Sequence, residues 1–218
     1  MFKEKPYVVL DYVPGAPVTA QWIAGHALQV GELLRLFHGD RALADALNEA
    51  GGPVTADRSV PSHLQSNLNL LDRISEHTYL KEARVRFREL SERVRPTPCV
   101  PTHGDPNCNN FLRSGRRLLL VDWDGLAVAD AGRDIGPLLW WYLKPDRWNE
   151  FFIAYGSVIP AETVYFWAAR ASLRVALWFA ERGRLSGAAQ FADDFVAASR
   201  MEENPRGNWK NDRDRGAE

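Results

Sequence analysis

Several features that would place a protein in a special class are missing from this sequence. Its 218 residues include only two cysteines, Cys99 and Cys108. These are too few for a disulfide framework, and a zinc site would need further Cys or His at ligand spacing. No stretch approaches the roughly 18 uncharged apolar residues of a membrane-spanning helix. The first 15 residues also lack the apolar run of a signal peptide. We therefore expect a cytoplasmic protein without a membrane partner.

A strong excess of charge of either sign is also missing. The 27 Lys and Arg residues nearly balance the 28 Asp and Glu residues, for a net charge of −1. The sequence thus gives no electrostatic reason to expect nucleic acid or an anionic membrane as a partner. The hydrophobic share of 45% and the charged share of 25% are those of an ordinary globular protein. A chain of this length can bury a substantial core, as one large domain or two small ones.

Hydrophobic patterning at the start of the chain predicts one strand and one long helix. Residues 7–13, YVVLDYV, are rich in β-branched and aromatic side chains and end at a Pro-Gly turn. From Thr19, a suitable N-cap, to His38, apolar residues recur at spacings of four and three. Gly39 follows where a helix commonly ends. This pattern predicts one helix over residues 19–38.

The rest of the chain predicts an α+β protein that is mostly helical. An apolar stripe with Arg and Glu on the other faces predicts an amphipathic helix over residues 78–95, which two prolines then end. The other expected segments are a loop or short helices at 40–62, a hairpin with Gly115 in its turn at 111–121, aromatic-rich helices from Ile135 onward and a disordered tail at 201–218.

Candidate catalytic residues concentrate in residues 99–125, CVPTHGDPNCNNFLRSGRRLLLVDWDG. Asp105 is followed after four residues by Asn110, and Asp122 ends the second strand of the hairpin. Turn chemistry explains any one of these residues alone. Together, their order and spacing match the needs of phosphoryl transfer, which uses a carboxylate base and oxygen ligands for Mg²⁺. In such a site Asn110 and Asp122 would hold the metal, Asp105 would act as base, and His103 would brace the loop.

The segments HGDPNCNNFL and VDWDGLAVADAGRDIG resemble the aminoglycoside phosphotransferase and choline kinase family. The family pattern is H-G-D-x-x-x-x-N, then D-W-(D/E), then D-(L/I). This resemblance implies a protein-kinase-like fold with ATP as phosphoryl donor, Mg²⁺ as cofactor and a small-molecule hydroxyl as acceptor. It also implies that His103 and Asp105 are catalytic, that Asn110 and Asp122 bind the metal and nucleotide, and that Asp134 is a buried support.

The same resemblance assigns the other segments of the chain. Residues 1–18 are similar to the hinge strand and turn of these kinases, where backbone groups at Asp11 and Val13 would meet the adenine edge. Residues 19–200 are similar to the C-terminal lobe, with the catalytic loop at 101–125 and a helical acceptor subdomain. Nothing in the sequence selects one acceptor among those that the family phosphorylates.

The N-terminal lobe expected from this resemblance is lacking. None of the 16 glycines forms a G-x-G-x-x-G loop, and no V-A-I-K-like strand precedes the hinge. Since that lobe holds the nucleotide phosphates, the chain alone should bind nucleotide weakly. We expect a second copy of the chain, a missing-lobe partner or an N-terminal segment missing from this sequence to cover the exposed hinge strand, and the sequence leaves open which of these applies.

Two further readings stay open on the sequence. One is a catalytically inactive kinase-like lobe that serves as a small-molecule-binding or partner subunit, which the missing phosphate loop favours. The other, a metal-dependent hydrolase, fits the spacing less well. Three residues without a role in the proposed metal site also carry expectations. His38 should have a surface or capping role, and Asp124 and Asp130 are candidates to face a cationic acceptor.

Overall fold

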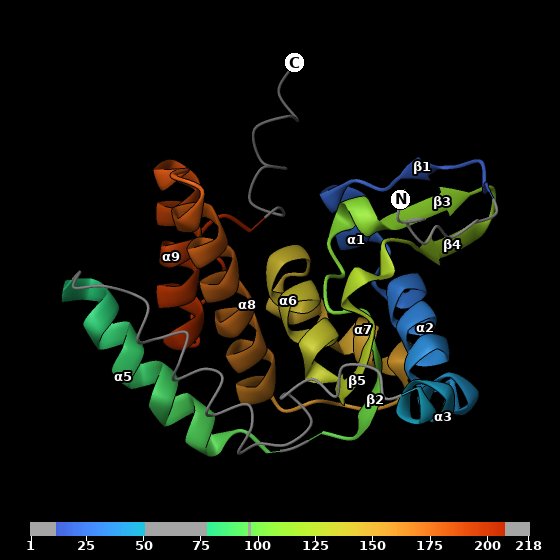
Figure 1. Ribbon diagram of the computed structural model, residues 1–218, viewed down its shortest axis with the longest axis horizontal. Helices are drawn as coiled ribbons and strands as arrows, with labels where there is room; N and C mark the ends of the chain where they lie inside the picture. The colour runs from blue at the N-terminus through green and yellow to red at the C-terminus, as the bar shows by residue number, and fades with distance from the viewer. Residues whose placement is uncertain (1–11, 51–77, 96, 208–218) are drawn as a thin grey trace, which may run out of the picture.

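The computed structural model describes residues 12–50, 78–95 and 97–207 (Figure 1). The predicted strand at 7–13 lies mostly outside these residues, as does Asp11. Tyr12 and Val13 are described and are not in a strand. The helices are α1 (Ala20–Gly25), α2 (Ala27–His38), α3 (Arg41–Glu49), α5 (Thr78–Arg93), α6 (Gly132–Tyr142), α7 (Trp148–Tyr155), α8 (Ala161–Glu181) and α9 (Leu185–Ser199). The predicted α+β, mostly helical architecture is confirmed.

The predicted helix over residues 19–38 is divided in two at His26, so the prediction of one helix is wrong. Thr19 is the N-cap as expected, and its hydroxyl accepts a hydrogen bond from Trp22 N at 3.1 Å. In a continuous helix, the carbonyl of Trp22 would accept from the backbone N–H of His26. The His26 ring takes that carbonyl instead, with Nδ1 donating at 2.7 Å. This competition, beside the weak helix former Gly25, ends α1 and restarts the chain as α2.

Two small antiparallel sheets carry the candidate site. Strand β2 (Cys99–Thr102) pairs with β5 (Ala127–Asp130), and β1 (Ala16–Pro17) pairs with β3 (Phe111–Ser114). The predicted hairpin is confirmed: β3 pairs with β4 (Arg117–Leu120). Gly115 has a φ of +57° in its turn, a conformation that favours glycine. Short 3₁₀ turns flank the hairpin at Cys108–Asn110 and Trp123–Gly125, and a third lies at Pro145–Arg147.

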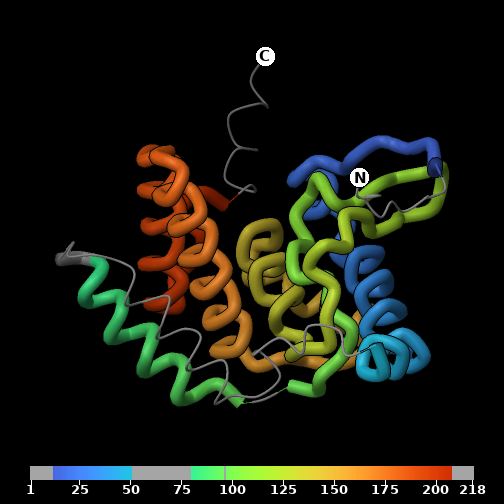
Figure 2. The backbone as a smooth tube through the Cα atoms, in the orientation of Figure 1, coloured from blue at the N-terminus to red at the C-terminus, as the bar shows by residue number. Residues whose placement is uncertain are grey.

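Helices α6, α8 and α9 form the body of the molecule, with α5 against α8 and α9 (Figures 1 and 2). The hairpin and α2 lie on the other side of α6. The stripe predicted for α5 is confirmed by the burial of Leu80, Ala83, Phe87, Leu90 and Val94. The Phe87 ring stacks on Phe166 of α8, with centroids 5.3 Å apart. None of the described helices is long and apolar enough to cross a membrane.

The prediction that disorder begins at residue 201 is wrong for residues 201–207, while 208–218 lie outside the described residues. Asn204 is only 3% exposed, and Trp140 Nε1 donates to the carbonyl of Glu202 at 2.9 Å. Arg206 pairs with the buried carboxylate of Asp194 on α9. The polar, aperiodic sequence of this segment suggested disorder. Its polar groups are instead held by buried partners on the helices, Trp140 and Asp194.

Candidate active site

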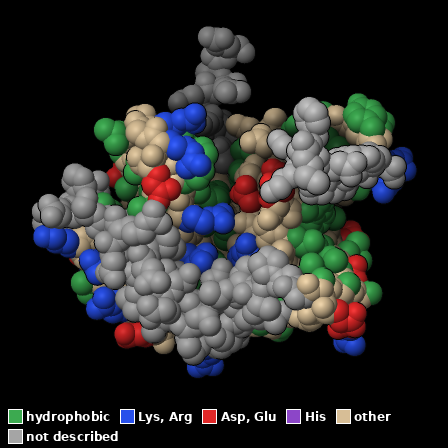
Figure 3. Space-filling view, viewed as in Figure 1, with side chains coloured by type: hydrophobic (Ala, Val, Ile, Leu, Met, Phe, Trp, Pro, Cys, Tyr) green, Lys and Arg blue, Asp and Glu red, His purple; other side chains and the backbone are tan. Residues whose placement is uncertain are grey.

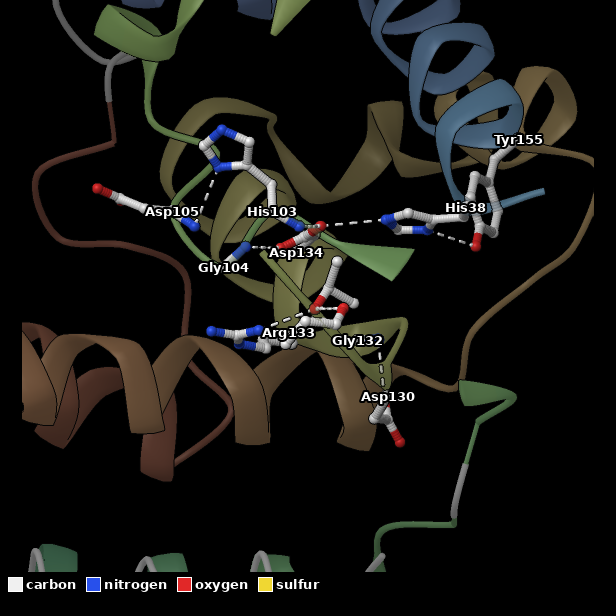
Figure 4. A network of polar contacts seen from close by, with 11 residues as sticks. His38, His103, Gly104, Asp105, Asp130, Gly132, Arg133, Asp134 and Tyr155 are labelled. Atoms are coloured by element: carbon white, nitrogen blue, oxygen red, sulfur yellow. Dashed lines mark hydrogen bonds and ion pairs between the residues drawn. The ribbon is translucent and has the colours of Figure 1, made fainter. Parts of the chain in front are cut away.

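A buried carboxylate holds the loop that carries the predicted catalytic residues. Asp134 lies in the first turn of α6 and is fully buried, as expected of a support. Its Oδ2 accepts a hydrogen bond from His103 N, and its Oδ1 accepts one from Gly104 N, both at 2.7 Å (Figure 4). One side chain thereby fixes two consecutive peptide groups immediately before Asp105.

His38 and Tyr155 complete this network from the far side of Asp134 (Figure 4). His38 Nε2 donates to Asp134 Oδ2 at 3.1 Å, and its Nδ1 lies 2.9 Å from the hydroxyl of Tyr155. The expectation of a surface or capping role for His38 is wrong, because only 5% of the residue is exposed. The sequence did hold a signal, since His38 continues the buried stripe of α2 one turn after Leu34.

Electrostatics in this network keep Asp134 ionised. Burial alone would raise the pKa of the carboxyl, but the hydrogen bond and charge of His38 and the two backbone N–H groups outweigh it. The pKa of Asp134 is therefore held below its ordinary value. Burial, with the charges of Asp134 and Asp130, raises the pKa of Tyr155 to about 12, so its hydroxyl stays protonated.

Glycine is required at position 104 for two reasons. Its φ of +84° lies in the left-handed region that other residues rarely adopt. A Cβ atom there would also collide with the guanidinium of Arg133, whose Nη1 donates to Thr102 Oγ1 at 2.8 Å. The left-handed turn at Gly104 and the two hydrogen bonds to Asp134 together fix the orientation of the backbone at Asp105.

His103 ties the loop to the hairpin and does not reach outward. It is fully buried, and its Nε2 donates to the carbonyl of Val121 at 2.9 Å. Its Nδ1 accepts from Asp105 N at 3.3 Å. With backbone groups at both ring nitrogens, the geometry fits the expected bracing role. Trp123 packs on the His103 ring, with centroids 4.9 Å apart.

Asp105, Asn110 and Asp122 meet at one end of the hairpin. Asn110 Nδ2 donates to the carbonyl of Asp105 at 2.8 Å. Val121 N donates to the carbonyl of Asn110 at 3.0 Å, which sets Asp122 next to it. Asp105 and Asp122 are exposed, and within the described residues neither carboxylate has a hydrogen bond or ion pair. These carboxylates are therefore available to a ligand.

The donor atoms at this end of the hairpin suit a hard cation. Because Asn110 uses its Nδ2 internally, its Oδ1 is the side-chain atom left to bind a cation. Magnesium takes oxygen ligands and keeps several waters, so one amide and one carboxylate fit it. No cluster of three or more His, Cys, Asp or Glu suited to a metal occurs in the described part of the chain. Since the donors that Asn110 and Asp122 offer are both oxygens, they fit Mg²⁺ better than a metal that prefers nitrogen or sulfur.

Two other expectations concern the acceptor. Asp130 is buried, and it accepts hydrogen bonds from Thr97 N, Thr97 Oγ1 and Gly132 N at 3.0, 2.6 and 2.8 Å. Asp130 therefore does not face an acceptor, and that expectation is wrong. Asp124 is exposed. Val13 is 38% exposed, and its expected adenine contact stays a prediction.

The backbone of Asp122 dictates which variants can test it. Its φ of +67° is left-handed, a conformation that Asn and Asp tolerate better than other side chains. Strain of this kind commonly marks functional positions. We predict that Asp122→Ala lowers the free energy of unfolding by about 1 kcal/mol relative to Asp122→Asn. Urea denaturation of the two variants checks this, and equal stabilities would contradict it.

A family model described as the phosphotransferase enzyme family matches residues 1–175. A macrolide 2'-phosphotransferase of Brachybacterium faecium is 18% identical with a TM-score of 0.63, and the match covers 84% of this chain and 67% of that one. A choline/ethanolamine kinase family protein of Mesorhizobium loti is 22% identical with a TM-score of 0.55, and the match covers 86% of this chain and 70% of that one. The aminoglycoside 2'-phosphotransferase-IIIa, solved as its GDP complex, is 15% identical with a TM-score of 0.65, and the match covers 87% of this chain and 69% of that one. The chain thus spans about two thirds of the length of these structures, and the kinase-like fold expected from the motif is confirmed.

Proposed function

Since this chain belongs to the phosphotransferase enzyme family, we propose that it transfers a phosphoryl group from Mg²⁺-bound ATP to a hydroxyl of a small molecule in the cytoplasm. One observation carries the proposal. Hydrogen bonds join Asn110 to the backbone of Asp105 and of Val121, the residue before Asp122, at the end of a braced hairpin, and both carboxylates lack a partner among the described residues. The GDP complex of a similar structure supports a nucleotide as donor.

Each residue has a defined task in the proposed reaction. Asp105 accepts the proton of the acceptor hydroxyl while the oxygen bonds to the γ-phosphorus and the bond to the nucleoside diphosphate breaks. Asn110 and Asp122 would hold Mg²⁺, which neutralises charge on the phosphate oxygens when bound. Asp134 and His103 keep the backbone of Asp105 in place, which matters because positioning supplies much of phosphoryl-transfer catalysis.

The alternative of an inactive, ligand-binding lobe finds no support in the site. A binding subunit has no need of two carboxylates, Asp105 and Asp122, that lack partners within the described part of the chain, and both are retained. An acceptor hydroxyl requires the first and a metal-bound nucleotide requires the second. Cover for the hinge strand by a second copy or a separate lobe stays a prediction.

Calorimetric titration of the full chain with ATP and GTP, with and without Mg²⁺, tests the nucleotide site. Binding should depend on Mg²⁺, and Asp122→Asn should weaken it about tenfold or more. Asp124→Asn removes the same charge two residues away and should leave binding unchanged. The proposed metal ligands would be contradicted if the nucleotide affinity did not depend on Mg²⁺, or if Asp122→Asn and Asp124→Asn weakened nucleotide binding equally.

A further inference from the structure

A basic side chain from α8 reaches the catalytic loop. Arg174 is exposed, and its Nη2 donates to the carbonyl of Gly104 at 3.2 Å. Gly104 immediately precedes Asp105, so this guanidinium lies beside the proposed base. Among the described residues Arg174 forms this one hydrogen bond and no ion pair. A guanidinium has five N–H donors, so most of its donors remain for a ligand.

Arg174 has basic neighbours on α6 and α8. Arg133 of α6 covers the α-carbon of Gly104 with its guanidinium. Arg170 lies one turn before Arg174 on α8, with its guanidinium 5.2 Å from the centroid of the Trp167 ring. Figure 3 shows Lys and Arg side chains in the middle of the viewed face, next to a few acidic ones. At least two guanidinium groups, those of Arg133 and Arg174, therefore lie against the backbone of Gly104, the residue before Asp105.

The buried carboxylates of this part of the molecule are engaged elsewhere, whereas Asp124 is exposed. Asp130 and Asp134 are buried in hydrogen bonds to the backbone and to Thr97 and His38. Asp194 is buried and paired with Arg206. In the proposed function Asp105 takes a proton and Asp122 holds the metal. A cationic acceptor would thus meet Arg174 without a matching carboxylate from these groups, and the juxtaposition of like charges disfavours binding.

We propose that the acceptor is a small hydroxylated anion, a hydroxy acid or a sugar phosphate, whose charged group is bound by Arg174. The planar guanidinium suits carboxylate and phosphate oxygens, which it contacts through two parallel hydrogen bonds. Arg133 and Arg170 add positive potential around the same group. Anchoring the anion there brings the rest of the acceptor, with its hydroxyl, next to Asp105. This inference rests on the proposed function and specifies the substrate class of that site.

A series of hexose derivatives that differ in charge tests the inference. Gluconate and glucose 6-phosphate are anions, glucose is neutral, and glucosamine is a cation at neutral pH. Binding of each to the full chain is measured by ligand-observed NMR, with and without Mg²⁺ and ADP. The two anions should bind about tenfold or more tightly than glucose, and glucosamine more weakly. Comparing the two anions shows whether a carboxylate or a phosphate is preferred.

Arg174→Gln should abolish the advantage of the anions and leave glucose binding unchanged. Arg182→Gln is the matched control, because Arg182 caps the C-terminal end of α8, where its guanidinium lies 4.1 Å from the centroid of the Trp178 ring. The control should keep the preference for anions. Tighter binding of glucosamine, or equal losses for anions and glucose in Arg174→Gln, would overturn the inference.

The nucleotide titration on the same proteins separates this inference from the proposed function. If the wild-type chain binds no Mg²⁺-nucleotide but still prefers anions through Arg174, the proposed function fails and the anion site stands. If nucleotide binding is normal and no charge preference appears, only the substrate class is overturned. If Arg174→Gln weakens nucleotide binding as much as anion binding, Arg174 serves the donor, and the inference is likewise overturned.

Discussion

Asp134→Asn is expected to lower the free energy of unfolding by about 3–5 kcal/mol, the usual cost of breaking a buried ionic network by removing one partner. The fully buried carboxylate accepts hydrogen bonds from His103 N, Gly104 N and His38 Nε2. An amide of the same shape supplies one oxygen where two are used and directs an NH₂ group at an N–H donor. Urea denaturation of the purified chain measures the loss.

The matched control is Asp124→Asn, which removes the same charge from an exposed position and should change stability by less than about 0.5 kcal/mol. His38→Phe leaves the Asp134 carboxylate buried with two of its three donors, so we expect it to fall between these variants. A loss below about 1 kcal/mol for Asp134→Asn would contradict the structural role assigned to this carboxylate.

This network also sets a pH dependence. The native pKa of Asp134 lies below the ordinary value of 3.8. The ionised carboxylate therefore stabilises the fold fully above about pH 4 and ceases to do so as the pH falls through the native pKa. The urea midpoint of the wild-type chain should fall more steeply on acidification below about pH 4 than that of Asp134→Asn. Parallel curves would contradict the lowered pKa.

Asp105→Asn is expected to reduce phosphoryl transfer by about 10²- to 10⁴-fold, the usual contribution of a general base. Because the Asp105 carboxylate is exposed and bonds to no described residue, the variant should keep the stability of the wild type. Asn110 contacts the backbone carbonyl of Asp105 and not its side chain, so Mg²⁺-dependent nucleotide binding should also persist. The rate is measured as the release of nucleoside diphosphate in the presence of an acceptor.

The separation of effects is what identifies the base. Asp105→Asn should change the rate and spare nucleotide binding, whereas Asp122→Asn should weaken nucleotide binding. A full rate in Asp105→Asn would remove the residue from the proposed mechanism. A loss of nucleotide binding in that variant would instead make Asp105 a metal ligand, which contradicts the division of roles.

Local sequence determined the parts of the structure that depend on local spacing. The hairpin with Gly115 in its turn and the buried stripe of α5 follow from period and turn chemistry alone. The H-G-D-x-x-x-x-N spacing likewise predicted that Asp105 and Asn110 lie close together. These features involve residues a few positions apart, for which the sequence contains most of the physical information.

Features that depend on distant partners could not be predicted this way. His38 contacts Asp134 across 96 positions, and Arg174 contacts Gly104 across 70. Residues 201–207 are polar and aperiodic, yet Arg206 pairs with the carboxylate of Asp194, which is buried once α9 has packed. The break at His26 depends on a ring nitrogen that takes a helical carbonyl, which helix periodicity does not reveal.

In the proposed site, Asn110 and Asp122 hold the metal of a bound nucleotide next to Asp105. The most direct test replaces Mg²⁺ with paramagnetic Mn²⁺ in the presence of ATP and follows the side-chain N–H signals by NMR. We predict that the signals of Asn110 Nδ2 and of the Trp123 indole broaden strongly, while that of Trp178, on the last turns of α8, stays sharp. Broadening should vanish in Asp122→Asn. Unchanged Asn110 and Trp123 signals at saturating nucleotide, or broadening centred elsewhere, would contradict the account.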